Sequence, residues 1–78
     1  MPTIFKIEGY RFFFFSNEHL PKHIHIEKAD AYVRIEIETL IVTDSYKCTT
    51  KEIKKLVALV KEHQEELKGA WNEYFKEQ

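Results

Sequence analysis

The sequence predicts an α+β fold: an antiparallel β-meander of three to five strands with one long C-terminal helix packed on one face. Two observations predict it. Residues 3–38 hold short segments of alternating apolar and polar side chains, which is the period of a strand. Residues 49–76 repeat apolar side chains at helical spacing. Because no linker or repeat interrupts the chain, we expect a single domain over 1–78, sheet-rich over 1–48 and helical over 49–76.

The first two strands are predicted over residues 3–7 and 10–15, with a tight turn at Glu8-Gly9 between them. The second of these strands is apolar on both faces. Tyr10, Phe12 and Phe14 share one face, and Arg11, Phe13 and Phe15 share the other. One helix covers only one face of a sheet, so we expect Phe13 and Phe15 to be left over. A second copy or a partner protein would then cover them.

A polar segment that contains Pro21 follows, and it predicts a loop over residues 16–22. A third strand is predicted over residues 23–28. Its alternation places His23 and His25 on one side and Ile24 and Ile26 on the other. We therefore expect the two histidines to point away from the main core, with His19 of the preceding loop within reach of one of them.

The fourth strand is predicted over residues 32–38, where Val33, Ile35 and Ile37 face inward. A turn at residues 29–31 precedes it. Residues 40–42 predict either a short fifth strand or a packed connection, and residues 44–48 predict a loop.

The helix has a clear start, because Thr49 lies three residues before Glu52, the spacing of a capping box. His63 or Gln64 interrupts its apolar stripe near the middle. Gly69 weakens the helix and predicts a bend or a break into two helices. The apolar stripe consists of Ile53, Leu56, Val57, Val60, Leu67, Trp71, Tyr74 and Phe75.

Composition restricts the classes of function. The formal net charge is −1, from 12 basic and 13 acidic residues, which argues against non-specific binding to nucleic acid but leaves room for a local basic patch. The single cysteine, Cys48, has no partner for an internal disulfide, as expected in a reducing cytosol. The sequence has no signal-peptide pattern and no apolar run long enough to span a bilayer. We expect a cytoplasmic protein with no membrane association.

Three histidines gather within seven residues, and they are the candidate site. As metal ligands, His19, His23 and His25 would hold a divalent ion, with Glu18 or Glu27 able to complete the set. His23 and His25 are about 7 Å apart at Cα along one strand face, which is a workable pair.

A catalytic interpretation uses the same residues. His23, His25 or His19 would act as general acid and base in metal-independent RNA cleavage. Arg11 or Lys22 would stabilise the negative charge that develops on phosphorus. A structural interpretation competes with both: the histidines would hydrogen-bond backbone groups of the loop or line a polar sheet face.

Several segments carry a resemblance to a known family: residues 2–19, the Pro21-Lys22-His23-Ile24-His25-Ile26 run, and residues 65–67 and 70–75. They resemble the domain of unknown function 4160 family, a group of small prokaryotic proteins. The resemblance implies a component of a toxin–antitoxin-like gene pair. Members commonly have a second proline where this chain has Lys22, which adds a positive charge beside the histidines.

Two functions are therefore expected. In the first, the histidine patch contacts RNA or protein within a toxin–antitoxin-like module, and the protein acts as a ribonuclease-like toxin. In the second, the protein is a non-catalytic antitoxin or adaptor whose aromatic sheet face forms a homodimer or binds a small protein partner. Metal binding by the histidine cluster is a further alternative.

Overall fold

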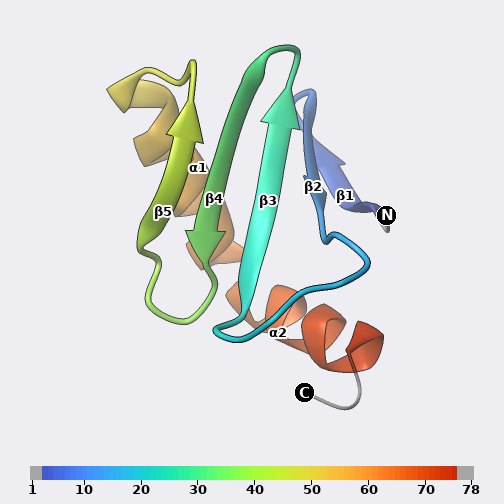
Figure 1. The fold of residues 1–78 in the computed structure, drawn as a ribbon. Helices are drawn as coiled ribbons and strands as arrows, with labels where there is room; N and C mark the ends of the chain where they lie inside the picture. The colour runs from blue at the N-terminus through green and yellow to red at the C-terminus, as the bar shows by residue number, and fades with distance from the viewer. Residues whose placement is uncertain (1–2, 76–78) are drawn as a thin grey trace.

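The computed structural model describes residues 3–75, which form a five-stranded antiparallel sheet and two helices (Figure 1). The strands pair in chain order, so the sheet is a meander. This confirms the predicted α+β class. The predicted helix end at residue 76 lies outside the described residues. The elements are β1 (Thr3–Ile7), β2 (Tyr10–Phe13), β3 (His23–Lys28), β4 (Ala31–Glu36), β5 (Val42–Tyr46), α1 (Thr50–Glu62) and α2 (Gln64–Tyr74).

The fifth strand lies further along the chain than predicted. Residues 37–41 make a tight connection in which the Leu40 N–H donates to Glu36 O and the Glu36 N–H donates to Ile41 O, both at 2.9 Å. Leu40 has a positive φ of 64° there. Because of this connection, β5 begins only at Val42, and it pairs with β4 from Val42 to Tyr46. The predicted loop over residues 44–48 is therefore wrong for most of its length.

Both helices lie on the same side of the sheet, with α1 behind the later strands and α2 at one end of the sheet (Figure 1). The side chains of that face alternate along the strands as predicted, since Ile24, Ile26, Val33 and Ile35 are all buried. These side chains form one core with the helices. The core comprises Tyr10, Phe12, Phe14, Ile24, Ile26, Val33, Ile35, Ile37, Leu56, Val60, Leu67 and Trp71.

The prediction of one long helix is wrong, because the helix divides at His63, between α1 and α2. The division falls where the apolar stripe is interrupted. Gln64 gives a physical reason, since its side-chain Nε2 donates to Ile37 O at 2.7 Å and to Glu38 O at 3.3 Å. These bonds tie the start of α2 to the end of the sheet. Gly69, the other expected break point, lies inside α2.

The second face of the sheet is covered differently from the prediction. Phe13, expected to be left over, is only 2 % exposed. The Arg11 guanidinium lies 4.2 Å from the centre of its ring, and the rings of Phe15 and His25 each lie 5.4 Å away. The cover comes from within the described chain, from β2, the loop that follows it and β3. Phe15 remains 40 % exposed. Self-association was expected because two phenylalanines would be uncovered, and only one of them, Phe15, is exposed. Self-association stays a prediction.

One acidic side chain joins the start of α1 to the sheet. Glu52 Oε1 accepts the Thr49 N–H at 3.0 Å while the Glu52 N–H donates to Thr49 Oγ1 at 3.1 Å, which completes the predicted capping box. The Tyr10 hydroxyl donates to Glu52 Oε2 at 2.8 Å. The bonds from the Thr49 N–H and from Tyr10 lower the pKa of Glu52, and the bond to Glu52 raises the pKa of Tyr10.

We expect Glu52→Gln to lower the melting temperature at neutral pH, because the neutral amide removes the charge that these donors stabilise. A group with a lowered pKa in the folded state contributes stability above its ordinary pKa, and this contribution is lost as pH falls through the folded value. The difference between Glu52→Gln and the parent should therefore shrink below about pH 4.5. Thermal melts at several pH values measure it, and a difference that stays constant from pH 7 to pH 3 would contradict this role.

We expect replacement of each of the two glycines by alanine to change the stability of the protein in opposite directions. A Cβ at Gly69 would meet nothing within 4 Å, so Gly69→Ala should raise the free energy of unfolding by about 0.5–1 kcal/mol. Gly9 has φ +84°, and a Cβ there would lie 3.1 Å from Lys28 Cε, so Gly9→Ala should destabilise the fold. Urea denaturation of both variants checks the pair. A loss of stability in Gly69→Ala would be inconsistent with an open helical site.

Candidate functional site

His23 and His25 lie on the face of the sheet opposite the helices, as the alternation predicts. Ile24 and Ile26, between and beside them, are buried in the core. In the sheet, His25 pairs with Phe13 of β2 and with Arg34 of β4. The strand therefore presents the two imidazoles side by side, with their ring centres 5.0 Å apart.

The connection between β2 and β3 brings a carboxylate to both histidines. Glu18 accepts from His23 Nε2 at 2.9 Å and from His25 Nε2 at 2.7 Å, one histidine on each oxygen. It also accepts the Phe15 N–H at 2.9 Å, a bond that closes the loop on itself. Glu18 is only 8 % exposed. We call Glu18, His23 and His25 the Glu-His-His cluster.

His25 is the most enclosed member of the cluster, at 2 % exposure. The ring of Phe15 lies edge-on at 4.3 Å, and the ring of Tyr32 is stacked at 5.9 Å. Its second nitrogen, Nδ1, lies 2.7 Å from the Tyr32 hydroxyl. Both ring nitrogens of His25 are therefore bonded to protein groups, and the aromatic neighbours separate the ring from solvent.

The surroundings favour a charged Glu18 beside a neutral His25. Burial alone would raise the pKa of Glu18, but the bonds from the Phe15 N–H and His23, together with the nearby histidine charges, outweigh it and lower the pKa. Burial lowers the pKa of His25, and the charges of His23 and Arg34 add to this while Glu18 opposes it. With Glu18 ionised, His25 Nε2–H donates to it and the Tyr32 hydroxyl donates to Nδ1.

His23 is held at both nitrogens as well. Its Nδ1 lies 2.8 Å from Pro21 O and its Nε2 lies 2.9 Å from Glu18 Oε1. A carbonyl oxygen and a carboxylate oxygen only accept, so both bonds form only when His23 donates from both nitrogens. A His23 that donates from both nitrogens is an imidazolium, and it then forms an ion pair with the Glu18 carboxylate.

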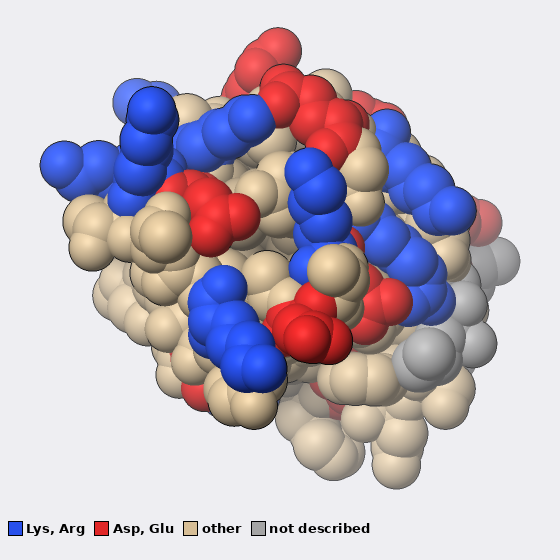
Figure 2. All heavy atoms as spheres, turned by 90° about the horizontal axis from the view of Figure 1, so that it is seen from above, with Lys and Arg blue, Asp and Glu red and all other residues tan. Residues whose placement is uncertain are grey.

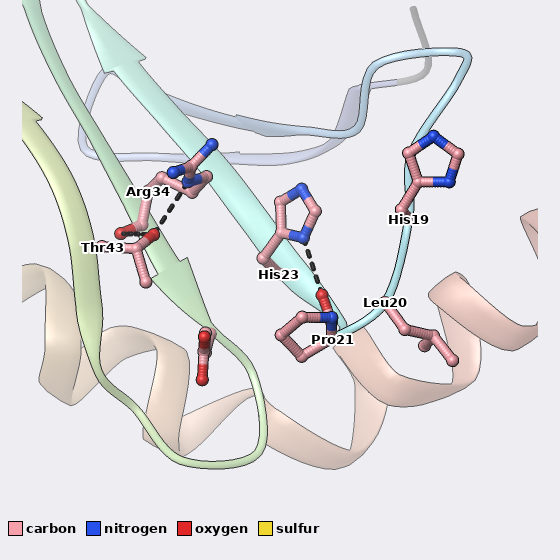
Figure 3. Close-up of a pocket in the computed structure, with 7 residues that line it drawn as sticks. His19, Leu20, Pro21, His23, Arg34 and Thr43 are labelled. Atoms are coloured by element: carbon pink, nitrogen blue, oxygen red, sulfur yellow. Dashed lines mark hydrogen bonds between the residues drawn. The ribbon is translucent and has the colours of Figure 1, made fainter.

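A pocket of about 210 Å³ opens beside His23 on this face. His19 and Leu20 of the loop lie on one side of it, Arg34 and Thr43 lie on the other, and His23 and Pro21 lie between them (Figure 3). Arg34 Nε–H donates to Thr43 Oγ1 at 2.8 Å, which orients the guanidinium. Glu36, the seventh lining residue, accepts from Thr39 Oγ1 and places a negative charge in the same pocket.

The other predicted site residues occupy separate positions. His19 lines the pocket with His23 but lies outside the Glu-His-His cluster. Arg11 donates to Glu27 at 2.7 Å and to Thr3 Oγ1 at 2.9 Å while it covers Phe13, so its guanidinium is engaged on the sheet. Glu27 is thereby paired with Arg11.

Sequence reasoning missed two contributors, Arg34 and Tyr32. Both lie on the outward face of a strand whose alternation was recognised. The signal that would have found them is the register of an antiparallel hairpin, which sets Arg34 opposite His25 and Tyr32 opposite Glu27.

Charges elsewhere on the surface are mixed. Basic and acidic side chains are interspersed on the end of the molecule seen in Figure 2. Ion pairs join Lys55 to Glu8 and Lys47 to Asp30. That end therefore offers no continuous basic surface, and the net charge of −1 is consistent with this.

We expect Glu18→Ala to destabilise the metal-free protein by about 2–5 kcal/mol. The substitution leaves the Phe15 N–H and the histidines without their acceptor in a buried place. Glu27→Ala is the matched control, since Glu27 is half-exposed on the same face and its ion pair with Arg11 is worth about 0–1 kcal/mol. Urea denaturation in the presence of a chelator measures both. Equal losses in the two variants would show that Glu18 has no special role in holding the loop.

Comparison with known families and proteins gives one result. Neither the curated proteins nor the solved structures contain a match to this chain. A family model described as a domain of unknown function, DUF4160, matches residues 9–72, a range that includes the Glu-His-His cluster and every residue lining the pocket. The chain therefore belongs to the DUF4160 family.

Proposed function

We propose that this protein is the RNA-contacting component of a prokaryotic toxin–antitoxin-like pair. The family resemblance supports the setting, because members resemble components of such gene pairs. The single observation that carries the RNA contact is the pocket, where the Arg34 guanidinium and the His19 imidazole line one space together with a hydroxyl group, beside the Glu36 carboxylate. Arginine, histidine and hydroxyl donors are the groups that bind a phosphate.

The size and position of the pocket fit one phosphate group rather than a long backbone. About 210 Å³ holds several water molecules or one group of phosphate size. We therefore expect weak binding to a short single-stranded segment through one or two phosphates, with base stacking on exposed aromatic side chains such as Tyr46 adding to it.

The two histidines of β3 are poorly placed to cleave RNA. His23 and His25 bond protein groups through both ring nitrogens, so neither presents a free nitrogen to a ribose hydroxyl. In a cleavage reaction His19 is the candidate base and Arg34 is the candidate for stabilising charge on phosphorus. His19 would take the proton of the ribose 2′-hydroxyl as its oxygen attacks phosphorus, the bond from phosphorus to the 5′-oxygen would break, and the protonated His19 would return the proton to the 5′-oxygen.

A competing proposal is a protein partner. Large apolar side chains are exposed on the described surface, and they include Phe15 and Leu20 of the loop and Ile41 of the connection before β5. A second copy of the chain or an unrelated small protein would bury them.

No helix among the described residues is both long and apolar enough to cross a membrane.

We expect Arg34→Ala to weaken binding of a short single-stranded RNA and to reduce its salt dependence. Each neutralised phosphate contributes a slope of about −0.7 to log K against log salt, so the parent should show a slope of about −0.7 to −1.4. Arg34→Ala should lower its magnitude by roughly one contact. Fluorescence anisotropy over a series of KCl concentrations measures both quantities.

Arg11→Ala is the matched control, because Arg11 is an arginine of the same face that is paired with Glu27 away from the pocket lining. It should leave the slope unchanged. Equal slopes in Arg34→Ala and Arg11→Ala, or no RNA binding by the parent, would reject the pocket as the contact. Gel analysis of the same RNA separates contact from cleavage: products that vanish in His19→Ala would assign catalysis to His19.

A further inference from the structure

We propose that the Glu-His-His cluster is a binding site for a divalent transition metal ion of the zinc class. Each residue offers one ligand atom, and the three atoms lie within 4.8 Å of one another. The Nε2 atoms of both histidines point at the two oxygens of one carboxylate, at 2.9 and 2.7 Å. Three donors that converge on one point in this way are what a metal ion requires.

The outer nitrogens of both histidines make the bonds expected of metal ligands. A histidine that binds a metal through Nε2 commonly donates its Nδ1–H to a carbonyl or another oxygen, which fixes the ring. Here His23 Nδ1 lies 2.8 Å from Pro21 O, and His25 Nδ1 lies 2.7 Å from the Tyr32 hydroxyl oxygen, which would accept from Nδ1–H once Nε2 binds a metal instead of donating to Glu18. The structure thus holds both rings with Nε2 turned inward.

A neutral His23 satisfies only one of its two contacts. A neutral His23 that donates Nδ1–H to Pro21 O turns an unshared electron pair on Nε2 toward the Glu18 carboxylate, and two acceptors at 2.9 Å repel each other. Either a proton or a metal ion resolves that contact. A metal ion resolves it by binding Nε2 of His23 and one carboxylate oxygen, and Nε2 of His25 is near enough to join them.

The donor set selects the kind of metal. Two imidazoles and one carboxylate suit zinc and neighbouring divalent ions, whereas calcium and magnesium prefer oxygen ligands alone. Zinc–nitrogen distances of about 2.0–2.1 Å place tetrahedral donors roughly 3.3 Å apart, so donors now 2.7–2.9 Å apart would separate slightly and donors near the 4.8 Å limit would move closer. The fourth position of a tetrahedral zinc is left to water or to another ligand.

The position of the site indicates how a bound metal ion would stabilise the fold. Glu18 comes from the loop before β3, while His23 and His25 come from β3 itself. An ion bound by all three would fasten the loop that carries His19 and Leu20, one wall of the pocket, to the sheet. Binding to the folded chain alone raises the melting temperature.

The test titrates chelator-stripped protein with Zn²⁺ against a chromophoric competitor, and with Co²⁺ followed by its visible absorption bands. The parent should bind one ion per chain, with Co²⁺ bands of a four-coordinate site and a higher melting temperature. His23→Ala, His25→Ala and Glu18→Gln should each weaken binding by about 100-fold or more, since even outer partners of metal ligands cost 10–100-fold.

The controls are the histidines outside the cluster. His63→Ala removes an imidazole that is paired with Glu66, and His19→Ala removes the one across the pocket. Both should bind Zn²⁺ and Co²⁺ as the parent does. Because His25 is buried and its variant can lose the fold, His23→Ala, whose side chain is 13 % exposed, decides the matter after circular dichroism shows it folded.

Three results would overturn the proposal. The first is a parent that binds no stoichiometric Zn²⁺ or Co²⁺. The second is a folded His23→Ala that binds as tightly as the parent. The third is a loss in His19→Ala or His63→Ala as large as that in His23→Ala, which would mean that surface imidazoles bind the ions. The test uses no RNA and no activity, so its result is independent of the proposed function.

Discussion

The structure of this face depends on one buried carboxylate. Glu18 accepts the Phe15 N–H and both β3 histidines, and these bonds fold the connection after β2 back over the sheet. A carboxylate in such a place is stable only when its oxygens are bonded, and here both are. The covered Phe13, the enclosed His25 and the wall of the pocket all depend on the loop staying there.

This arrangement gives a 78-residue chain a second small packed layer. Domains of this size bury only about 60 % of their unfolded surface, and one core between sheet and helices leaves the opposite face exposed. The loop supplies part of the missing cover through Phe15, and aromatic side chains of β2, β3 and β4 supply the rest. Phe13, Phe15, His25 and Tyr32 lie in contact, and Arg11 covers the edge of the group. The need for a partner on this face is correspondingly smaller than the strand pattern suggested.

The sequence predicted the features that follow from the local spacing of apolar residues. It did not predict the features that depend on contacts between residues far apart in the chain. Alternation in β3 and β4 placed the histidines opposite Ile24 and Ile26, and the spacing of Thr49 and Glu52 located the start of α1. The sequence located the segment that contains the site but not the full set of residues that form it. The position of Glu18 between the histidines depends on how a loop folds over the sheet. Arg34 lies beside His25 because of the register between β3 and β4. The helix divides at His63 because Gln64 bonds the carbonyl of Ile37, 27 residues earlier in the chain, which no helical period reveals.

The packing of α2 has a consequence for the order in which the protein matures during synthesis. Trp71, near the end of the described chain, lies 5.3 Å from the His23 ring and 5.4 Å from the Phe14 ring. The sheet strands pair with their neighbours in the chain, so they are able to associate as they leave the ribosome. The contact between Trp71 and the His23 ring therefore forms only once α2 has been synthesised. A nascent chain that lacks α2 therefore has the residues of all five strands but not the finished surroundings of His23, and the site becomes complete only after α2 has been synthesised.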